Sequence, residues 1–294
     1  MTDRRDAGGR PPVILSIQSS VAYGHVGNSA AAFPLMRMGV EVWPVLTVHF
    51  SNHTGYPSWR GPLLAPTDVA EVVRGIEERE VLDRVGAVLS GYQGDPAVGE
   101  VILDTVATVR RHNPAALYCC DPVMGDVGRG FYVRPGIPAL MRDRVVPAAQ
   151  LITPNQFELE ALTGLPSGTT AGLLEAADRA RSLGPEVVLV TSAVLADAEP
   201  DSIAMVAVDA DGAWSVVTPR LPRTFTGAGD LTAAVFLAHR LRGADLPTAL
   251  AETAAAVFGI LRVTVEAGES ELALVRGQEE LVQPTSRFEV TRLR

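Results

Sequence analysis

Lysine is absent from this chain of 294 residues, and all 25 of its basic residues are arginine. A chain without lysine cannot form the internal aldimine of enzymes that use pyridoxal phosphate as a cofactor, because that bond needs a lysine amine. It also lacks the lysine of a Walker A loop. If the protein transfers phosphate from a nucleotide, it does so with another architecture.

Cysteine and positive charge are also scarce. Cys119 and Cys120 are adjacent in an apolar run, which predicts small core residues in a reducing, cytoplasmic setting rather than a disulfide framework. The net charge of −9 argues against a nucleic acid partner, which would need a basic face. No apolar run approaches the length of a membrane span. Residues 1–12 are polar and basic, and predict a disordered tail rather than a signal peptide.

Short apolar runs alternate with amphipathic stretches along the rest of the chain. Strands are predicted at residues 13–17, 42–48, 87–89, 117–120, 151–152 and 187–191, with a hairpin of 203–208 and 213–217. Helices are predicted at 28–38, 68–78, 96–111, from 155 onward, and at 171–183, 228–241 and 251–261. This alternation predicts an α/β fold whose mostly parallel sheet has helices on both faces. Without an internal repeat or low-complexity linker, residues 13–294 are predicted to form a single domain.

The most informative stretch opens the predicted helix 228–241. Gly227, Ala228 and Gly229 are small, so several backbone N–H groups can converge where the positive end of the helix dipole favours an anion. Asp230 would not help to bind an anion, but it makes sense as a base that takes a proton from a hydroxyl attacking a phosphate. Taken alone, the turn favours a simpler interpretation in which Asp230 only caps the helix.

Polar residues follow several predicted strands, where ligands of parallel sheets bind. They include Ser19, Tyr92, Asp121 and Asn155, and Asp121 could share a magnesium ion with Glu158 through water. Each has a simpler interpretation: a loop residue for Ser19, packing for Tyr92 and a turn before proline for Asp121. The spacing of Asn155 and Glu158 also fits a capping box, and both roles of Glu158 can hold at once.

Six segments occur in the order found in one known family. They are residues 16–31 (SIQSSVAYGHVGNSAA), 47–55 (TVHFSNHTG), 89–92 (LSGY), 121–125 (DPVMG), 153–160 (TPNQFELE) and 227–230 (GAGD). Each is a weak signal alone, but together they make the chain, from about residue 13 to 258, resemble the pyridoxal kinases of the ribokinase-like superfamily, most closely the bacterial ones. The resemblance implies a three-layer ribokinase-like fold with helices on both faces of a mostly parallel central sheet.

The same resemblance implies an ATP-dependent phosphorylation of pyridoxal in vitamin B6 salvage. Asp230 would activate the 5′-hydroxymethyl group, and Gly227, Ala228 and Gly229 would form the anion hole. Pyridoxal would be bound by Ser19, Thr54, Gly55, Tyr92 and Asp230, and ATP by Asp121, Thr153, Glu158, Thr191, Pro219, Arg220, Leu221 and Pro222, with Mg²⁺ held by Asp121 and Glu158 through water. Members of the superfamily are commonly homodimers, which implies a homodimer here.

Two features depart from the family, and two other functions stay open. Thr191 stands where many close relatives have a lysine near the nucleotide phosphates, and Arg220 or Arg223 would be an unequal replacement. The stretch 214–227 is a few residues shorter than the corresponding stretch in these relatives. One alternative is a kinase for a hydroxymethylpyrimidine or a sugar-like alcohol, against which residues 51–54 argue. The other is a weakly catalytic protein that binds vitamin B6, which the residue at position 191 would explain.

Overall fold

The computed structural model describes residues 11–294, so nearly all of the predicted tail at 1–12 lies outside the described residues. Within residues 11–294 a nine-stranded sheet has the order β11-β10-β9-β8-β7-β4-β3-β1-β2, and β5 pairs with β6 in a separate sheet. The strands are β1 (Val13–Val21), β2 (Glu41–Phe50), β3 (Val85–Ser90), β4 (Leu117–Cys120), β5 (Gly125–Asp126), β6 (Gly130–Phe131), β7 (Leu151–Ile152), β8 (Val187–Ala193), β9 (Ser202–Val208), β10 (Ala213–Pro219) and β11 (Val290–Arg292).

The sheet is mostly parallel. From β2 through β1, β3, β4 and β7 to β8 all neighbouring strands are parallel, whereas β9, β10 and β11 continue the sheet in antiparallel pairs. The strands β3 and β4 are buried along nearly their whole length, as expected for a sheet covered on both faces. This topology confirms the predicted fold class. It also brings the carboxyl ends of the parallel strands to one edge, where ligands of such sheets bind.

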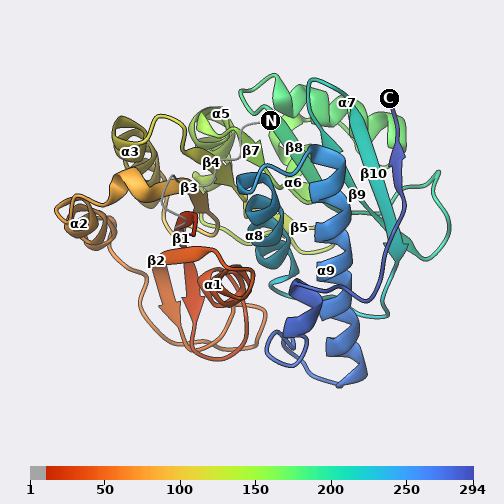
Figure 1. Ribbon diagram of the computed structural model, residues 1–294, viewed down its shortest axis with the longest axis horizontal. Helices are drawn as coiled ribbons and strands as arrows, with labels where there is room; N and C mark the ends of the chain where they lie inside the picture. Colours follow the sequence, from red (N-terminus) through yellow and green to blue (C-terminus); the bar gives the residue numbers. More distant parts are fainter. Residues whose placement is uncertain (1–10) are drawn as a thin grey trace.

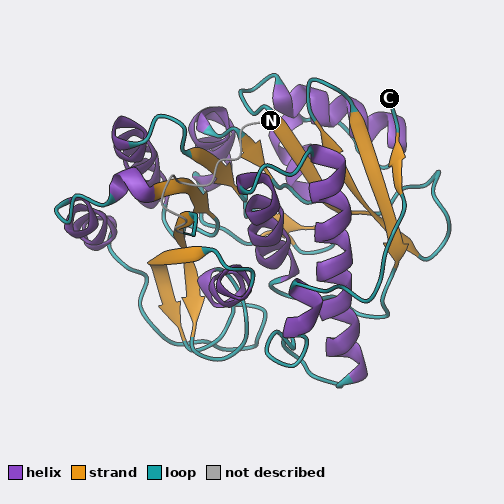
Figure 2. Cartoon of the chain, in the orientation of Figure 1, coloured by secondary structure: helices purple, strands orange, loops and turns teal. Residues whose placement is uncertain are grey.

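Helices cover both faces of the sheet. Figure 1 shows α8 and α9 side by side across one face, and α1 contacts α8. In Figure 2 the purple helices flank the orange strands. The helices are α1 (Asn28–Arg37), α2 (Pro66–Glu77), α3 (Pro96–His112), α4 (Ile137–Leu140), α5 (Val146–Ala148), α6 (Gln156–Thr163), α7 (Thr170–Arg181), α8 (Ala228–Leu241) and α9 (Leu246–Glu266), with 3₁₀ turns at Leu82–Arg84 and Gln278–Leu281 and a π-helical turn at Met141–Val145.

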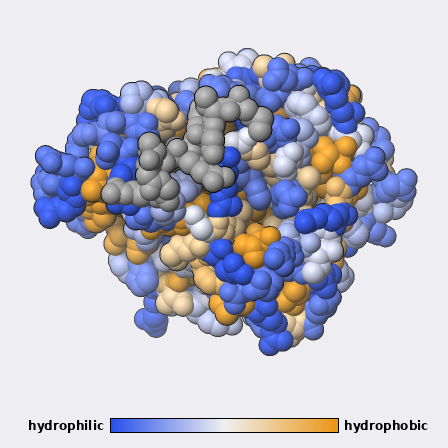
Figure 3. Space-filling view, viewed as in Figure 1, coloured by the Kyte–Doolittle hydropathy of each residue, from blue (hydrophilic) through white to orange (hydrophobic). Residues whose placement is uncertain are grey.

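The core consists of two clusters, one on each face of the sheet. Alternate residues of β1 enter different clusters: Leu15 packs with residues of α2, α3, α6 and α7, and Ile14 packs with residues of α1, α8 and α9. Cys119 and Cys120 divide between the two clusters in the same way, and both are buried and free. This confirms that the two cysteines are core residues. The face drawn in Figure 3 is largely hydrophilic, with apolar residues in small scattered patches.

Helix α9 is longer and more apolar than the sequence patterns predict. By length and composition alone it could cross a membrane, but more than half of its apolar stretch is buried against α8 and the sheet, as in a core helix of a soluble fold. It begins at Leu246 rather than 251, because Asp245 caps it by accepting a hydrogen bond from the Thr248 N–H (2.9 Å).

Other differences from the sequence predictions have local causes. Ser19 was expected to follow the first strand, but it lies inside β1, which stays paired with β2 as far as Val21 and Phe50 across a register shift. The π-helical turn and the short strands β5, β6 and β11 are also outside the prediction. Segments of two to five residues carry too little periodicity to be identified from a sequence.

Candidate functional site

The small residues predicted to form an anion hole do open a long helix. Gly227 is the N-cap of α8 and has a φ of 87°, a left-handed conformation that favours glycine. A Cβ atom at this position would also collide with the carbonyl oxygen of His25. Ala228 and Gly229 form the first turn of α8, and a Cβ on Gly229 would meet only open space. The helix start therefore offers free backbone N–H groups beside an open surface.

Asp230 lies in this first helical turn and is only partly exposed. Burial raises the pKa of its carboxyl group to about 6, although the backbone N–H groups of Gly27 and of Asp230 itself act in the opposite direction. A carboxyl group with this pKa is ionised at neutral pH and still close enough to that pH to accept a proton efficiently. These are the properties of a general base.

Gly27 connects Asp230 with Ser19. Gly27 has a φ of 52°, and a Cβ atom there would collide with both the hydroxyl and the carbonyl oxygen of buried Ser19. Its backbone N–H also lowers the pKa of Asp230, so Ser19 and Asp230 both lie next to Gly27. Asn28 holds this part of β1 in place, since its side-chain amide donates to the carbonyl oxygens of Ser16 and Gln18 (both 3.3 Å).

Asp121 and Thr153 lie side by side where β4 and β7 end. The Thr153 hydroxyl donates to Oδ1 of Asp121 (3.0 Å), and the two residues are 2% and 4% exposed, respectively. Burial raises the pKa of Asp121 well above its ordinary value, and the negative charges of Glu158 and Asp230 raise it further. The three predicted acids therefore belong to one site.

Glu158 has the capping-box role that its sequence pattern suggests, and it also accepts a hydrogen bond from a second segment. It completes a capping box with Asn155, whose side chain accepts from the Glu158 N–H (2.9 Å) while Glu158 accepts from the Asn155 N–H (3.0 Å). Its other carboxylate oxygen accepts from the Met124 N–H (2.9 Å). Burial raises its pKa to about 8, against the lowering effect of these backbone hydrogen bonds.

None of these three acids pairs with a cation among residues 11–294: the ion pairs found there involve other carboxylates. Negative charge is costly to bury unless a partner compensates for it. The same part of the chain holds no group of three or more His, Cys, Asp or Glu side chains that could hold a metal ion. Carboxylate oxygens are a ligand type of Mg²⁺, which usually keeps several waters and takes only one or two carboxylates.

Of the residues predicted to contact ATP outside this cluster, Thr191 is bonded next to it, whereas the hydrogen bond of the segment 219–222 leads to another loop. Thr191 is buried in β8, and its N–H donates to the carbonyl oxygen of Pro154 (2.9 Å), one residue from Thr153. Pro219 ends β10, and Arg220, Leu221 and Pro222 follow it in a loop, where the Arg220 N–H donates to Asp201 (2.8 Å). The guanidinium group of Arg223 donates to the carbonyl oxygens of Glu269 (2.6 Å) and Ser270 (2.9 Å).

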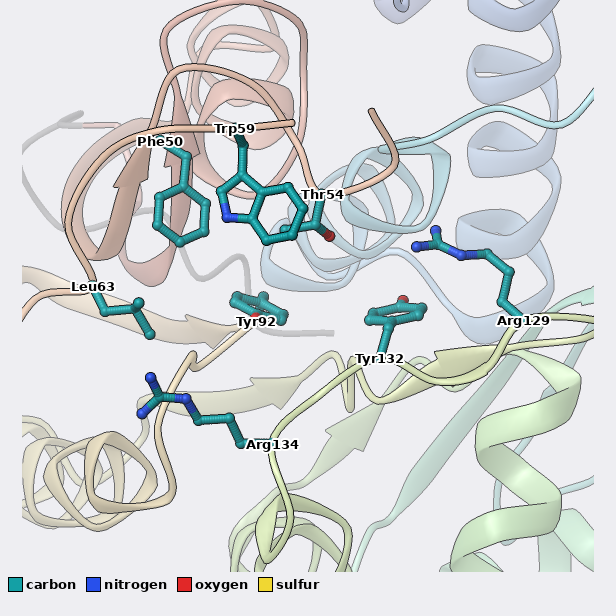
Figure 4. A pocket seen from close by; sticks show the side chains of 8 residues that line it. All are labelled: Phe50, Thr54, Trp59, Leu63, Tyr92, Arg129, Tyr132 and Arg134. Atoms are coloured by element: carbon teal, nitrogen blue, oxygen red, sulfur yellow. The ribbon is translucent and has the colours of Figure 1, made fainter. Parts of the chain in front are cut away.

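An aromatic cavity lies at the other end of the site. Its volume is about 340 Å³, and Figure 4 shows the side chains that line it: Phe50, Thr54, Trp59, Leu63, Tyr92, Arg129, Tyr132 and Arg134. Thr54 and Tyr92 were predicted as vitamin contacts, and both line this cavity. Gly55 lies near the anion turn, with the Thr226 hydroxyl 4.0 Å from the position of a Cβ atom on Gly55.

Tyr132 is a site residue that the sequence reasoning missed. Burial raises its pKa, and the negative charges of Glu158, Asp230 and Asp121 raise it further, so Tyr132 lies near all three acids while it lines the aromatic cavity. Arg129 stacks over its ring, 4.9 Å from the centroid. The available signal was the glycine-rich turn at residues 125–130 that precedes Phe131 and Tyr132. Such turns present their neighbours at sheet edges.

Comparison with known proteins gives a consistent family. Residues 96–274 match the phosphomethylpyrimidine kinase family. The pyridoxal kinase PdxY of Rubrobacter xylanophilus is 60% identical over 281 residues, which are 95% of this chain and 97% of that protein. PdxY of Leifsonia xyli is 56% identical over 280 residues, with 95% and 99% of the two chains covered.

Solved structures show the same fold. A pyridoxal kinase from Leishmania donovani in complex with ADP and ginkgotoxin superposes with a TM-score of 0.91 at 29% identity, covering 96% of this chain and 100% of that one. A putative phosphomethylpyrimidine kinase from Bacteroides thetaiotaomicron superposes with a TM-score of 0.88 at 25% identity, covering 97% and 99%. These neighbours support the ribokinase-like arrangement implied by the sequence motifs.

Proposed function

The chain belongs to the pyridoxal kinase family, and we propose that it transfers the γ-phosphoryl group of ATP to the 5′-hydroxymethyl oxygen of pyridoxal, which yields pyridoxal 5′-phosphate for vitamin B6 salvage. The observation that carries this proposal is the placement of Asp230. Its carboxyl group has a pKa raised to about 6 and belongs to the first turn of α8, beside the small residues of the anion turn. Asp230 and Ser19, the predicted vitamin contact, both lie next to Gly27.

The chemistry follows from this placement. Asp230 takes the proton of the vitamin's hydroxyl as the oxygen attacks the γ-phosphorus, and the bond to the leaving ADP breaks in line. The N–H groups of Gly227, Ala228 and Gly229 stabilise the charge on the transferring group, because N–H groups at a helix start have no partner within the helix and favour an anion. Ser19 orients the pyridine ring, Thr54 and Gly55 lie beside it, and Tyr92 forms an aromatic wall.

The buried acids support the nucleotide end of the proposal. Asp121 and Glu158 would hold Mg²⁺ through water, and this ion supplies the positive charge that neutralises the phosphates of ATP when bound. Thr153, Thr191 and the segment 219–222 would complete the nucleotide site. We also propose, from the family resemblance, that the protein is a cytoplasmic homodimer in which residues 13–294 form one domain.

A panel of alcohol substrates tests the function. ADP release would be measured with pyridoxal, pyridoxine, pyridoxamine and 4-amino-5-hydroxymethyl-2-methylpyrimidine, each with and without Mg²⁺. We expect the highest kcat/KM for a B6 vitamer and loss of turnover without Mg²⁺. A clear preference for the pyrimidine would contradict the proposal.

The pyrimidine kinase is a second candidate, because the matching family and one structural neighbour carry that description. A third candidate, a B6-binding protein with little turnover, is motivated by Thr191 at the nucleotide end. Pyridoxal binding without ADP formation from any vitamer would favour this third candidate.

A further inference from the structure

Glu271 joins two loops of the site, residues 24–25 and residues 53–56, that are far from it in sequence. It follows α9 in a segment leading to the 3₁₀ turn Gln278–Leu281, and its side chain is 11% exposed. One carboxylate oxygen accepts from the backbone N–H of His25 (3.2 Å). The other accepts from the Tyr56 hydroxyl (2.7 Å) and lies 3.1 Å from Nε2 of His53. A single carboxylate thus accepts hydrogen bonds from both loops.

The hydrogen bonds around His53 assign the tautomer of its imidazole ring. The Gly55 N–H donates to Nδ1 of His53 (3.1 Å), so Nδ1 carries no proton and Nε2 donates to Glu271. The imidazole ring also stacks against Tyr56, with the ring centroids 4.6 Å apart. His53 and Tyr56 flank Thr54 and Gly55 in sequence. Glu271 therefore holds both ends of the segment that carries these two predicted vitamin contacts.

The second loop connects Glu271 with the anion turn. The carbonyl oxygen of His25 lies where a side chain on Gly227 would be, and a methyl group of Leu272 lies 3.4 Å from the same position. Gly24 approaches Glu271 so closely that a Cβ atom there would collide with its carboxylate. The residues around Glu271 consequently form one side of the turn that would receive the phosphoryl group.

We propose that Glu271 is a positioning residue for the transfer: it holds the loop 53–56 beside the vitamin cavity and the loop 24–25 against the anion turn, and thereby sets the affinity for the vitamin. The proposal rests on the proposed function in its choice of substrate. It does not place Glu271 in contact with the reacting atoms. The larger effect is expected on the vitamin, because two of its three partners, His53 and Tyr56, flank Thr54 and Gly55.

Glu271→Ala removes all three interactions, and we expect it to raise the KM for pyridoxal about tenfold or more, with a smaller fall in kcat and a KM for ATP within about twofold of wild type. Glu271→Gln keeps an oxygen that can accept from His53 and Tyr56, so it should restore much of the affinity. The matched control is Glu269→Ala, an acid on the same segment whose carboxylate pairs with Arg276 (3.4 Å) and, among residues 11–294, makes no hydrogen bond to either loop, so both KM values should stay unchanged.

A second measurement does not depend on activity. Amide hydrogen exchange at residues 24–26 and 53–58 should be faster in Glu271→Ala than in wild type and unchanged in Glu269→Ala. If wild type fails to phosphorylate pyridoxal but the exchange pattern appears, the proposed function is wrong and the positioning role of Glu271 stands. Normal pyridoxal KM in an active Glu271→Ala variant would overturn the inference.

Tyr56→Phe supports the test if Glu271→Ala folds poorly, since it removes one hydroxyl and leaves the ring. We expect a two- to fivefold rise in the pyridoxal KM and less than additive effects when it is combined with Glu271→Gln. In Glu271→Ala, a fall in kcat together with equal rises in the KM for pyridoxal and the KM for ATP, and a lower Tm, would mean that Glu271 only stabilises the fold. This result would overturn its positioning role.

Discussion

The two ends of the site are built in opposite ways. At the nucleotide end, Asp121 and Glu158 are almost fully buried and held by hydrogen bonds from nearby strand ends and a helix start. At the vitamin end, the cavity is aromatic, and its loops are held by contacts between distant segments such as that of Glu271 with His53. At the nucleotide end, burial therefore makes the ionised form of both carboxyl groups less favourable. The vitamin end depends instead on how its loops are placed. Asp230 lies between them.

The largest expected effect is at Asp230. Asp230→Asn keeps the shape of the side chain but cannot accept the proton, so kcat should fall by about 10³-fold, while the KM values stay within a few-fold. Steady-state kinetics with pyridoxal and a binding measurement with the same preparation would check this. Near-normal turnover would show that another group takes the proton.

The next effect separates the two roles of Glu158. Glu158→Gln can keep the capping box but cannot form a carboxylate, so the KM for ATP in limiting Mg²⁺ should rise about tenfold, while the Tm near pH 7 should not fall because a buried acid with a raised pKa is removed. Glu158→Ala should show the same kinetic loss and also lose about 1 kcal/mol of stability with the cap. Kinetics at several Mg²⁺ concentrations and thermal unfolding would be measured for both variants. Equal ATP affinity in Glu158→Gln and wild type would remove Glu158 from the nucleotide site.

A smaller effect concerns stability rather than rate. Between the ordinary pKa of 3.8 and about 6, folded Asp230 binds a proton that the unfolded chain does not, so this residue lowers stability as pH rises through that interval. Asp230→Asn should therefore be more stable than wild type at pH 7.5, by about 1 to 2 kcal/mol after allowance for solvent screening, and the gain should vanish near pH 4. Unfolding at the two pH values would check this. A variant that is less stable than wild type at pH 7.5 would contradict the raised pKa.

The smallest effect concerns the missing lysines. Because the chain has no side-chain amine, borohydride reduction with pyridoxal phosphate should leave its side chains unmodified. Arg134→Lys places an amine beside the vitamin cavity and should become labelled there, while Arg37→Lys, which lies outside the cavity on α1, serves as the control. Peptide mass spectrometry after reduction at equimolar aldehyde would measure this. Equal labelling of both variants would show that the cavity does not concentrate the product.

The sequence predicted the features that depend on neighbouring residues. The glycine-rich turn before Asp230 and the capping box of Asn155 and Glu158 have local patterns, and the structure contains both. The parallel sheet followed from alternating periodicities in the same way. Family resemblance then linked these local patterns into one expected site.

Features that depend on distant contacts could not be predicted in this way. Ser19 lies inside β1 because of pairing with β2, which no pattern around residue 19 reveals. Tyr132 reaches the acids from a two-stranded hairpin too short to identify. Glu271 is more than 200 residues from both His25 and His53, and only the fold brings the three together.

The dependence of kcat/KM on pH, measured for wild type and Asp230→Asn with pyridoxal at saturating ATP and Mg²⁺, tests the role of Asp230 most directly. With a pKa of about 6, the wild-type rate should fall about tenfold for each pH unit below that value, and the residual rate of the variant should lack this dependence. An acid limb that persists unchanged in Asp230→Asn would contradict the assignment of Asp230 as the base.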